Sequence, residues 1–129
     1  MYVEKIEELY LAVVEYLETC DALITDIQKS TYREHETGYH RYNEATYYKR
    51  EASISKIEML CGLYFPEVEF EPKEYCISKM PAFWAATSGQ FARKEVSGEE
   101  VVKKSRDHID KASLKLKAIC RDLMNSNML

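Results

Sequence analysis

The sequence begins MYVEKIEELYLAVVEYLETCDALITDIQK (residues 1–29), and this stretch decides the fold class. Its apolar residues recur at alternating intervals of three and four positions, at Ile6, Leu9, Val13, Tyr16, Cys20, Leu23 and Ile27. Such spacing is typical of an amphipathic α-helix with one face turned to a protein core. We therefore predict a core-facing helix from about Tyr2 to Lys29 or a little beyond.

Two further segments show the same helical period. One begins near Asn43, a residue favoured at the N-cap, and ends at Pro66. Another begins at Ser97, where the pattern Ser97-x-x-Glu100 is a capping box. Its apolar stripe again alternates intervals of three and four, at Val102, Ser105, Ile109, Ala112, Leu116, Ile119 and Leu123. Both segments are predicted to be helices that pack on the first.

The segment between these two helices contains a proline inside its helical pattern. Pro72 suits the first turn of a third helix, but Pro81 removes a backbone hydrogen bond and clashes with the preceding turn. We expect this helix to be kinked or broken near Pro81. Four amphipathic helices with short connections favour an all-α fold, a four-helix antiparallel up-down-up-down bundle that forms a single domain over residues 1–129.

Charge is distributed unequally between the first and last helices. Residues 1–29 hold seven acidic and two basic side chains, whereas residues 97–129 hold seven basic and five acidic ones. In the expected bundle these helices lie side by side, so unlike charges would flank a shared seam. The net charge of −4 argues against a general nucleic-acid binder, because affinity for phosphate comes from a basic surface.

Neither end of the chain nor its interior suggests a membrane segment. The N-terminal residues are too charged for a signal peptide. The longest stretch without a formal charge, Met80 to Ala92, is shorter than the roughly 20 residues of a membrane helix. We therefore expect a soluble, cytoplasmic protein with no membrane partner.

The sequence contains no recognisable motif for binding a metal ion or a cofactor. The four cysteines, Cys20, Cys61, Cys76 and Cys120, form no CxxC pair and have no histidine at ligand spacing, so we expect buried thiols, with disulfides as the alternative. The Glu-x-x-His pairs of di-iron bundles are absent from the sequence, and four scattered glycines do not make a phosphate loop. We predict no metal and no cofactor.

The stretch YREHETGYHRYNEATYYKR, residues 32–50, is rich in residues that dominate binding surfaces. Tyrosine and arginine combine a large contact area with a polar group. We interpret part of this stretch as a recognition patch for a protein partner, formed by Tyr32, Tyr39, His40, Arg41, Tyr42 and Tyr48. The alternative is a group of solvated tyrosines without a partner. The first interpretation makes the protein a non-enzymatic interaction bundle, an adaptor or accessory protein of unknown partner, and we expect it to be a homodimer.

One enzymatic alternative concerns the same stretch. Arg33 and His40 are separated by six residues, which is similar to the arginine–histidine motif of the HEPN ribonucleases, small helical bundles that act as dimers. The resemblance implies that this pair would assist attack of a ribose 2′-hydroxyl on the adjacent phosphate. The sequence departs from the family at Glu34, whose charge opposes a bound phosphate, and at Gly38, which interrupts the helix that would carry the motif.

The uncharged stretch MPAFWAATSGQFA contains a second group of candidate residues, Phe83, Trp84 and Phe91. Aromatic residues at helical spacing usually belong to the core. Because Phe83 and Trp84 are adjacent, however, they project about 100° apart and do not both face the same centre. The alternatives are the seam of a homodimer, or an aromatic-lined pocket beside Pro81 that binds a small molecule.

The run ISKIEMLCGLYFPE, Ile54 to Glu67, resembles a helix-to-loop pattern of small uncharacterised bacterial four-helix-bundle proteins of the mobile gene-cassette type. The likeness covers about a tenth of the chain and the general layout. It implies a four-helix bundle encoded by a bacterial accessory gene, and it implies no activity.

Overall fold

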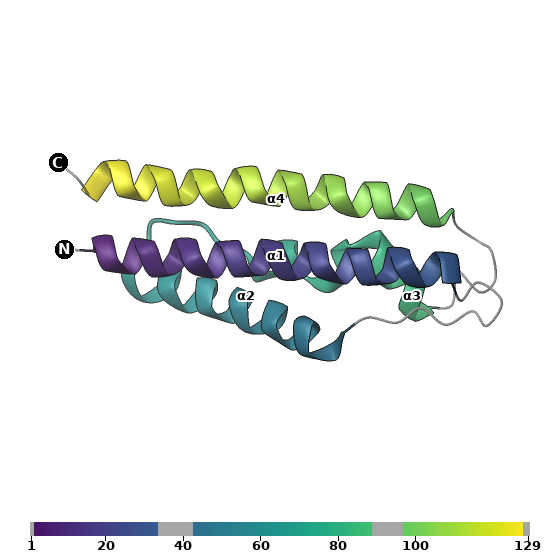
Figure 1. Cartoon of the computed structure of the whole chain (residues 1–129). Coiled ribbons are helices and arrows are strands. Elements are labelled where there is room, and N and C mark those ends of the chain that lie inside the picture. The colour runs from purple at the N-terminus through teal and green to yellow at the C-terminus, as the bar shows by residue number, and fades with distance from the viewer. Residues whose placement is uncertain (1, 34–42, 89–96, 128–129) are drawn as a thin grey trace.

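The computed structural model describes residues 2–33, 43–88 and 97–127 (Figure 1). Within these ranges the chain contains four α-helices and no strand, which confirms the all-α class. The helices are α1 (Val3–Arg33), α2 (Glu44–Tyr64), α3 (Pro81–Ser88) and α4 (Gly98–Asn127), with two 3₁₀-helices, η1 (Pro72–Tyr75) and η2 (Ile77–Lys79), between α2 and α3. No helix in this described part is long and apolar enough to cross a membrane.

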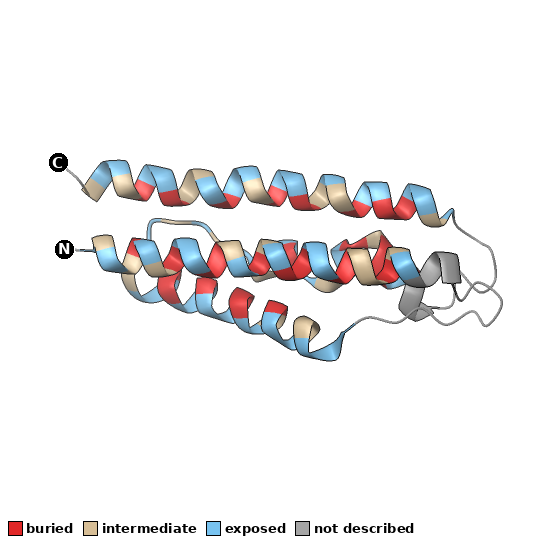
Figure 2. Cartoon of the chain, viewed as in Figure 1, coloured by how far each residue is buried: buried red, intermediate tan, exposed pale blue. Residues whose placement is uncertain are grey.

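Helix α1 supplies the largest share of the core. Every residue of its predicted apolar stripe is at most 1% exposed: Ile6, Leu9, Val13, Tyr16, Cys20, Leu23 and Ile27. The helix continues to Arg33, one turn beyond Lys29, which agrees with the predicted end at or a little beyond Lys29. Figure 2 shows its buried positions alternating with exposed ones along the part of the helix whose burial is described. The spacing of apolar residues therefore correctly identified the face that packs on the rest of the molecule.

Helices α2 and α4 both lie alongside α1, and the two chain ends lie at the same end of the molecule (Figure 1). At that end, the Tyr2 ring packs edge-on against Tyr64, with ring centroids 5.8 Å apart. Further along α1, Arg106 Nη1 of α4 donates to Asp21 Oδ1 at 2.5 Å. This pair joins an acidic side chain of the first helix to a basic one of the last, as the charge distribution suggested.

Both predicted helix starts carry the expected caps. The Asn43 side chain accepts a hydrogen bond from Thr46 N at 3.2 Å, and the Ser97 hydroxyl accepts one from Glu100 N at 3.3 Å. The second half of the Ser97 capping box does not form as predicted, since the Glu100 carboxylate pairs with Lys104. Each cap satisfies a backbone N–H that the helix itself leaves free.

The segment predicted as a third helix from Pro72 is not continuous. It forms η1 and η2, and α3 begins only at Pro81. Met80 has the extended backbone that a following proline imposes, which separates η2 from α3. The start of α3 is fixed to α4, because Ala82 N donates to the buried Ser105 Oγ at 2.9 Å. Proline thus sets where α3 begins, and Ser105 sets where it is held.

Candidate functional site

A fully buried arginine lies at the centre of the bundle. Arg50, on α2, is 0% exposed. Its Nε donates to Cys20 Sγ at 3.2 Å, its Nη1 donates to Glu51 Oε1 at 2.7 Å, and its Nη2 donates to the backbone carbonyl of Tyr75. The guanidinium also lies 5.1 Å from the centroid of the Tyr16 ring. The Arg50 side chain therefore connects α1, α2 and η1. We call Arg50, Tyr16, Cys20, Glu51 and Tyr75 the Arg50 cluster.

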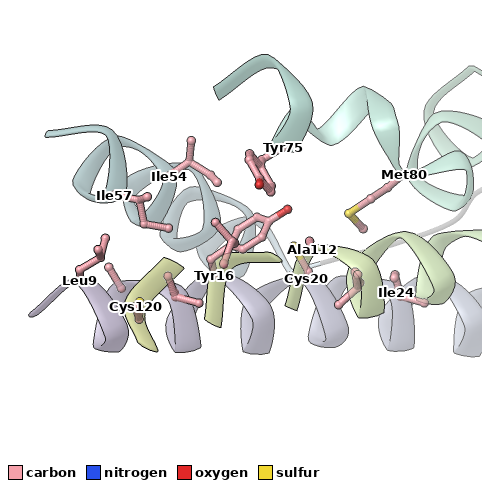
Figure 3. Close-up of a cluster of buried hydrophobic side chains, with 14 of the residues drawn as sticks. Leu9, Tyr16, Cys20, Ile24, Ile54, Ile57, Tyr75, Met80, Ala112 and Cys120 are labelled. Atoms are coloured by element: carbon pink, nitrogen blue, oxygen red, sulfur yellow. The ribbon is translucent and has the colours of Figure 1, made fainter. Parts of the chain in front are cut away.

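Burial sets the protonation states in this cluster. It raises the pKa of the Tyr16 phenol and the pKa of the Cys20 thiol, so both groups are neutral near pH 7. The carboxylate of Glu51 is then the acidic partner of the permanently charged Arg50. Figure 3 shows Tyr16 and Tyr75 pointing toward each other among apolar side chains, with ring centroids 5.9 Å apart. This arrangement suits a structural clamp better than acid–base catalysis.

Two buried polar atoms near this centre have no hydrogen-bond partner among the described groups, Tyr16 Oη and His108 Nε2. His108 lies on α4, one turn before Ala112. Burial and the positive charges of Arg50, Lys79 and Lys111 lower the pKa of His108. The imidazole is therefore neutral in the folded protein near pH 7.

The second region of interest is a surface groove between α1 and α4. We call it the α1/α4 groove, and its volume is about 470 Å³. It is lined by Ile6, Glu7, Tyr10, Leu11, Lys117, Cys120, Arg121 and Met124. Ile6 and Cys120 are buried at its floor. Its wall on α1 carries Glu7, and its wall on α4 carries Lys117 and Arg121.

Large apolar side chains are exposed at this groove. Leu11 on α1 is 66% exposed and Tyr10 is 44% exposed, while Leu114, about one turn before the groove residue Lys117 on α4, is 75% exposed. The charged residues of its walls, Glu7, Lys117 and Arg121, form no ion pair with any other described residue. The groove thus combines uncovered apolar area with unpaired charges of opposite sign on its two walls.

Most residues of the predicted recognition patch fall where the structure gives no side-chain information. Tyr39, His40, Arg41 and Tyr42 lie outside the described residues, and Tyr32 ends α1 together with Arg33. Tyr48 is described: it is 66% exposed, and its ring centroid lies 5.5 Å from that of Tyr47. The patch and the Arg33–His40 pair therefore remain predictions.

The second predicted group divides between interior and surface. Phe83 is 8% exposed and stacks on Tyr47 with ring centroids 5.8 Å apart, so it belongs to the core. Trp84 is 54% exposed on the neighbouring face of α3. Phe91 lies outside the described residues.

All four cysteines are free thiols, but one of them is not buried as predicted. Cys20, Cys61 and Cys120 are buried, whereas Cys76 is exposed. The reason is local: Cys76 lies between η1 and η2 instead of on the predicted helix. The Ser78 hydroxyl donates to its Sγ at 3.3 Å, which lowers the pKa of this thiol. No group of three or more potential metal ligands occurs among the described residues.

Sequence reasoning missed both the buried arginine and the groove. A signal for Arg50 existed, because it lies three residues after Tyr47 and four before Ile54, at the spacing of an apolar helical stripe. Leu11 lies outside the apolar stripe of its helix, so only the packing of α1 against α4 makes it part of a groove.

Comparison with known proteins gives no further guide to function. No family model matches the chain, and neither the curated proteins nor the solved structures contain a match.

Proposed function

We propose that this chain is a non-enzymatic protein-interaction bundle that binds an amphipathic helix of a protein partner in the α1/α4 groove. The observation that carries the proposal is the exposure of Leu11 and Leu114 beside a groove of about 470 Å³. Covering a leucine side chain completely contributes about 1.5–3 kcal/mol, so these two residues favour association.

The charges of the groove define the chemistry of the partner helix. Glu7 on one wall favours basic side chains on the partner, and Lys117 and Arg121 on the other favour acidic ones. Between Glu7 on one wall and the basic residues on the other, the partner helix presents apolar side chains to Tyr10 and Leu11. This is the helix-in-groove mode of recognition, in which spaced apolar anchors supply affinity and flanking charges supply specificity.

The proposal includes a finer architecture than the helical class alone. We infer an antiparallel up-down-up-down bundle whose third arm is interrupted before Pro81. The contacts of Tyr2 with Tyr64 and of Asp21 with Arg106 support this order of helices. A cytoplasmic location is also part of the proposal, and the four free thiols suit a reducing compartment.

The tyrosine-rich stretch at residues 32–50 is kept as a second proposed contact surface. Tyr48 supports it, because a tyrosine that is 66% exposed offers both a ring face and a hydroxyl to a partner. This surface and the groove are separable by mutation, since Tyr48 lies on α2 and the groove lies between α1 and α4.

The test is capture of partners by chemical cross-linking, followed by rebinding with each purified candidate. Leu11→Glu is expected to weaken binding by more than about tenfold, because it places a charge against the apolar anchors of the partner. Leu63→Glu is the matched control: Leu63 is 68% exposed, close to the 66% of Leu11, but lies on α2. If no protein, including the chain itself, binds in a manner that depends on Leu11, the proposed function is wrong.

A further inference from the structure

We propose that a second copy of this chain covers the α1/α4 groove, in a dimer whose two-fold axis runs parallel to α1 and α4. This inference rests on the proposed function, since it names the partner of the same groove. It rests on the positions of apolar and charged residues along the axes of α1 and α4.

Arg106 of α4 contacts Asp21, Thr25 and Gln28 of α1, and these contacts define the register of the two helices. Leu11 lies ten residues before Asp21, and Leu114 lies eight residues after Arg106. Residue numbers run in opposite senses along the pair, because Ile6 of α1 and Met124 of α4 meet in the groove. At 1.5 Å per residue the Asp21–Arg106 pair places the two leucines about 3 Å apart in height, and the Ile6–Met124 contact places them about 8 Å apart.

The walls of the groove follow the same register. Glu7 lies 14 residues before Asp21, and Arg121 lies 15 residues after Arg106. An acidic group on the α1 wall and a basic group on the α4 wall thus occur at nearly equal heights. The outer face of the helix pair is therefore complementary to itself when α1 and α4 exchange places.

A two-fold axis parallel to the helices makes this exchange. It places α1 of each copy over α4 of the other, so that Glu7 meets Arg121 at nearly the same height and Leu11 lies within about one to two turns of Leu114. A two-fold axis across the helices instead places α1 over α1. Residues 1–29 carry seven acidic and two basic side chains, so that arrangement brings like charges together.

The available area is sufficient for a stable dimer. Helices α1 and α4 contain 31 and 30 residues. With a rise of 1.5 Å per residue and a width of about 10 Å each, their joint outer face measures roughly 45 Å by 20 Å, or about 900 Å² per copy. Interfaces of standard size bury about 800 Å² per partner.

The first experiment measures the mass of the protein in solution by light scattering after size-exclusion chromatography. The wild-type chain and the Leu63→Glu control are expected to have twice the mass of one 15.1 kDa chain, and Leu114→Glu the mass of a single chain. A circular dichroism spectrum of each variant verifies that the helices are retained. A monomeric wild-type protein, or a Leu114→Glu protein that stays dimeric, overturns the inference.

Charge exchange tests the predicted pairing of the walls. Glu7→Arg and Arg121→Glu are each expected to weaken the dimer several-fold, because each places like charges on opposite walls. The double variant restores opposite signs and is expected to recover the dimer. Single variants without effect, or a double variant weaker than both, contradict the pairing of Glu7 with Arg121.

Cysteine cross-linking distinguishes the two possible axes. In a Cys76→Ser background, which removes the exposed native thiol, a mixture of Leu11→Cys and Leu114→Cys proteins is expected to form a mixed disulfide on oxidation with a copper–phenanthroline reagent. Leu11→Cys alone is expected to form little disulfide. Efficient pairing of Leu11→Cys with itself overturns the parallel axis.

These outcomes separate the inference from the function on which it rests. If the wild-type chain is monomeric but another purified protein binds in a manner that depends on Leu11, the groove is an interaction site and its occupant is not a second copy. If the chain is dimeric and neither Leu11→Glu nor Leu114→Glu affects any association, both proposals are wrong.

Discussion

The Arg50 cluster and the α1/α4 groove both contain arginine, tyrosine and a carboxylate, but their surroundings differ. In the cluster, the buried guanidinium donates to groups on α1, α2 and η1, all supplied by the same chain. In the groove, Arg121 and Glu7 form no ion pair with another described residue, and Leu11 is 66% exposed. The same residue types therefore stabilise the fold in one region and remain open to a partner in the other.

This contrast separates a structural from a functional use of charge. A buried charge is costly unless it is paired and hydrogen-bonded, so the partners of Arg50 are required by the fold itself. An exposed charge has no such requirement, and an unpaired one contributes little to folding. Unpaired charges beside exposed leucines are therefore better evidence for binding than the more unusual buried arginine.

The largest expected effect comes from comparing the same type of substitution, arginine to leucine, made separately at Arg50 and at Arg121. Arg50→Leu removes the donors to Cys20 and to the Tyr75 carbonyl, leaving polar groups unpaired in the core. We expect the free energy of unfolding to fall by about 3 kcal/mol, measured by urea denaturation. Arg121→Leu, in the groove, is expected to change it by less than about 0.5 kcal/mol when both proteins are compared as monomers, in the Leu114→Glu background.

A conservative variant sharpens this test. Arg50→Lys keeps the charge but loses the planar fork of donors, so its stability should lie between those of the wild type and Arg50→Leu. If Arg50→Leu is as stable as the wild type, the cluster does not hold the three elements together and the contrast between the two regions fails.

The fold was predictable wherever it depends on local pattern. The stripe of α1 and the caps at Asn43 and Ser97 follow from residue spacing and from hydrogen bonds within a few residues, and each of them is found. The third helix was predicted too long, because η1 and η2 depend on how residues 72–80 pack on their neighbours. The helix propensity of these residues alone does not determine how they pack.

The candidate site was less predictable because it depends on two helices at once. Leu11 and Leu114 each appear as a single exposed leucine in a polar helix face, which is common in soluble proteins. Their relation to one another depends on how α1 packs against α4, which neither helix determines alone. The tyrosines at residues 32–50 were more conspicuous in the sequence, since they lie close together along the chain.

A smaller effect is expected at the unpartnered hydroxyl of the cluster. Tyr16 Oη is buried without a hydrogen-bond partner in the described part of the protein, so removing it abolishes no such bond. Tyr16→Phe keeps the ring beside Arg50 and removes a desolvated polar atom. We expect a change of less than about 1 kcal/mol in the free energy of unfolding, toward greater stability.

The comparison for this variant is Tyr16→Leu, which removes the aromatic ring as well. It should be clearly less stable than Tyr16→Phe, because the ring packs on Tyr75 at 5.9 Å and on the guanidinium of Arg50. A loss of more than about 1 kcal/mol in Tyr16→Phe would show that the hydroxyl does have a partner, such as an ordered water molecule.

The smallest expected effect is a pH dependence that arises from His108. Burial lowers its pKa in the folded protein below the ordinary 6.5, so the unfolded chain binds the proton more readily. Stability is therefore lost as the pH falls from 6.5 toward the folded pKa, and it is retained above 6.5. His108→Gln removes this contribution. Its free energy of unfolding should therefore fall less than that of the wild type between pH 7 and pH 5, and the difference between the two proteins isolates His108 from the carboxylates that titrate in the same range.

Equal pH dependence in both proteins would mean that His108 is protonated as easily in the folded state as in the unfolded one. Its neighbours Arg50, Lys79 and Lys111 would then have no effect on it, and the positive charge of the buried cluster would be confined to the contacts that Arg50 makes.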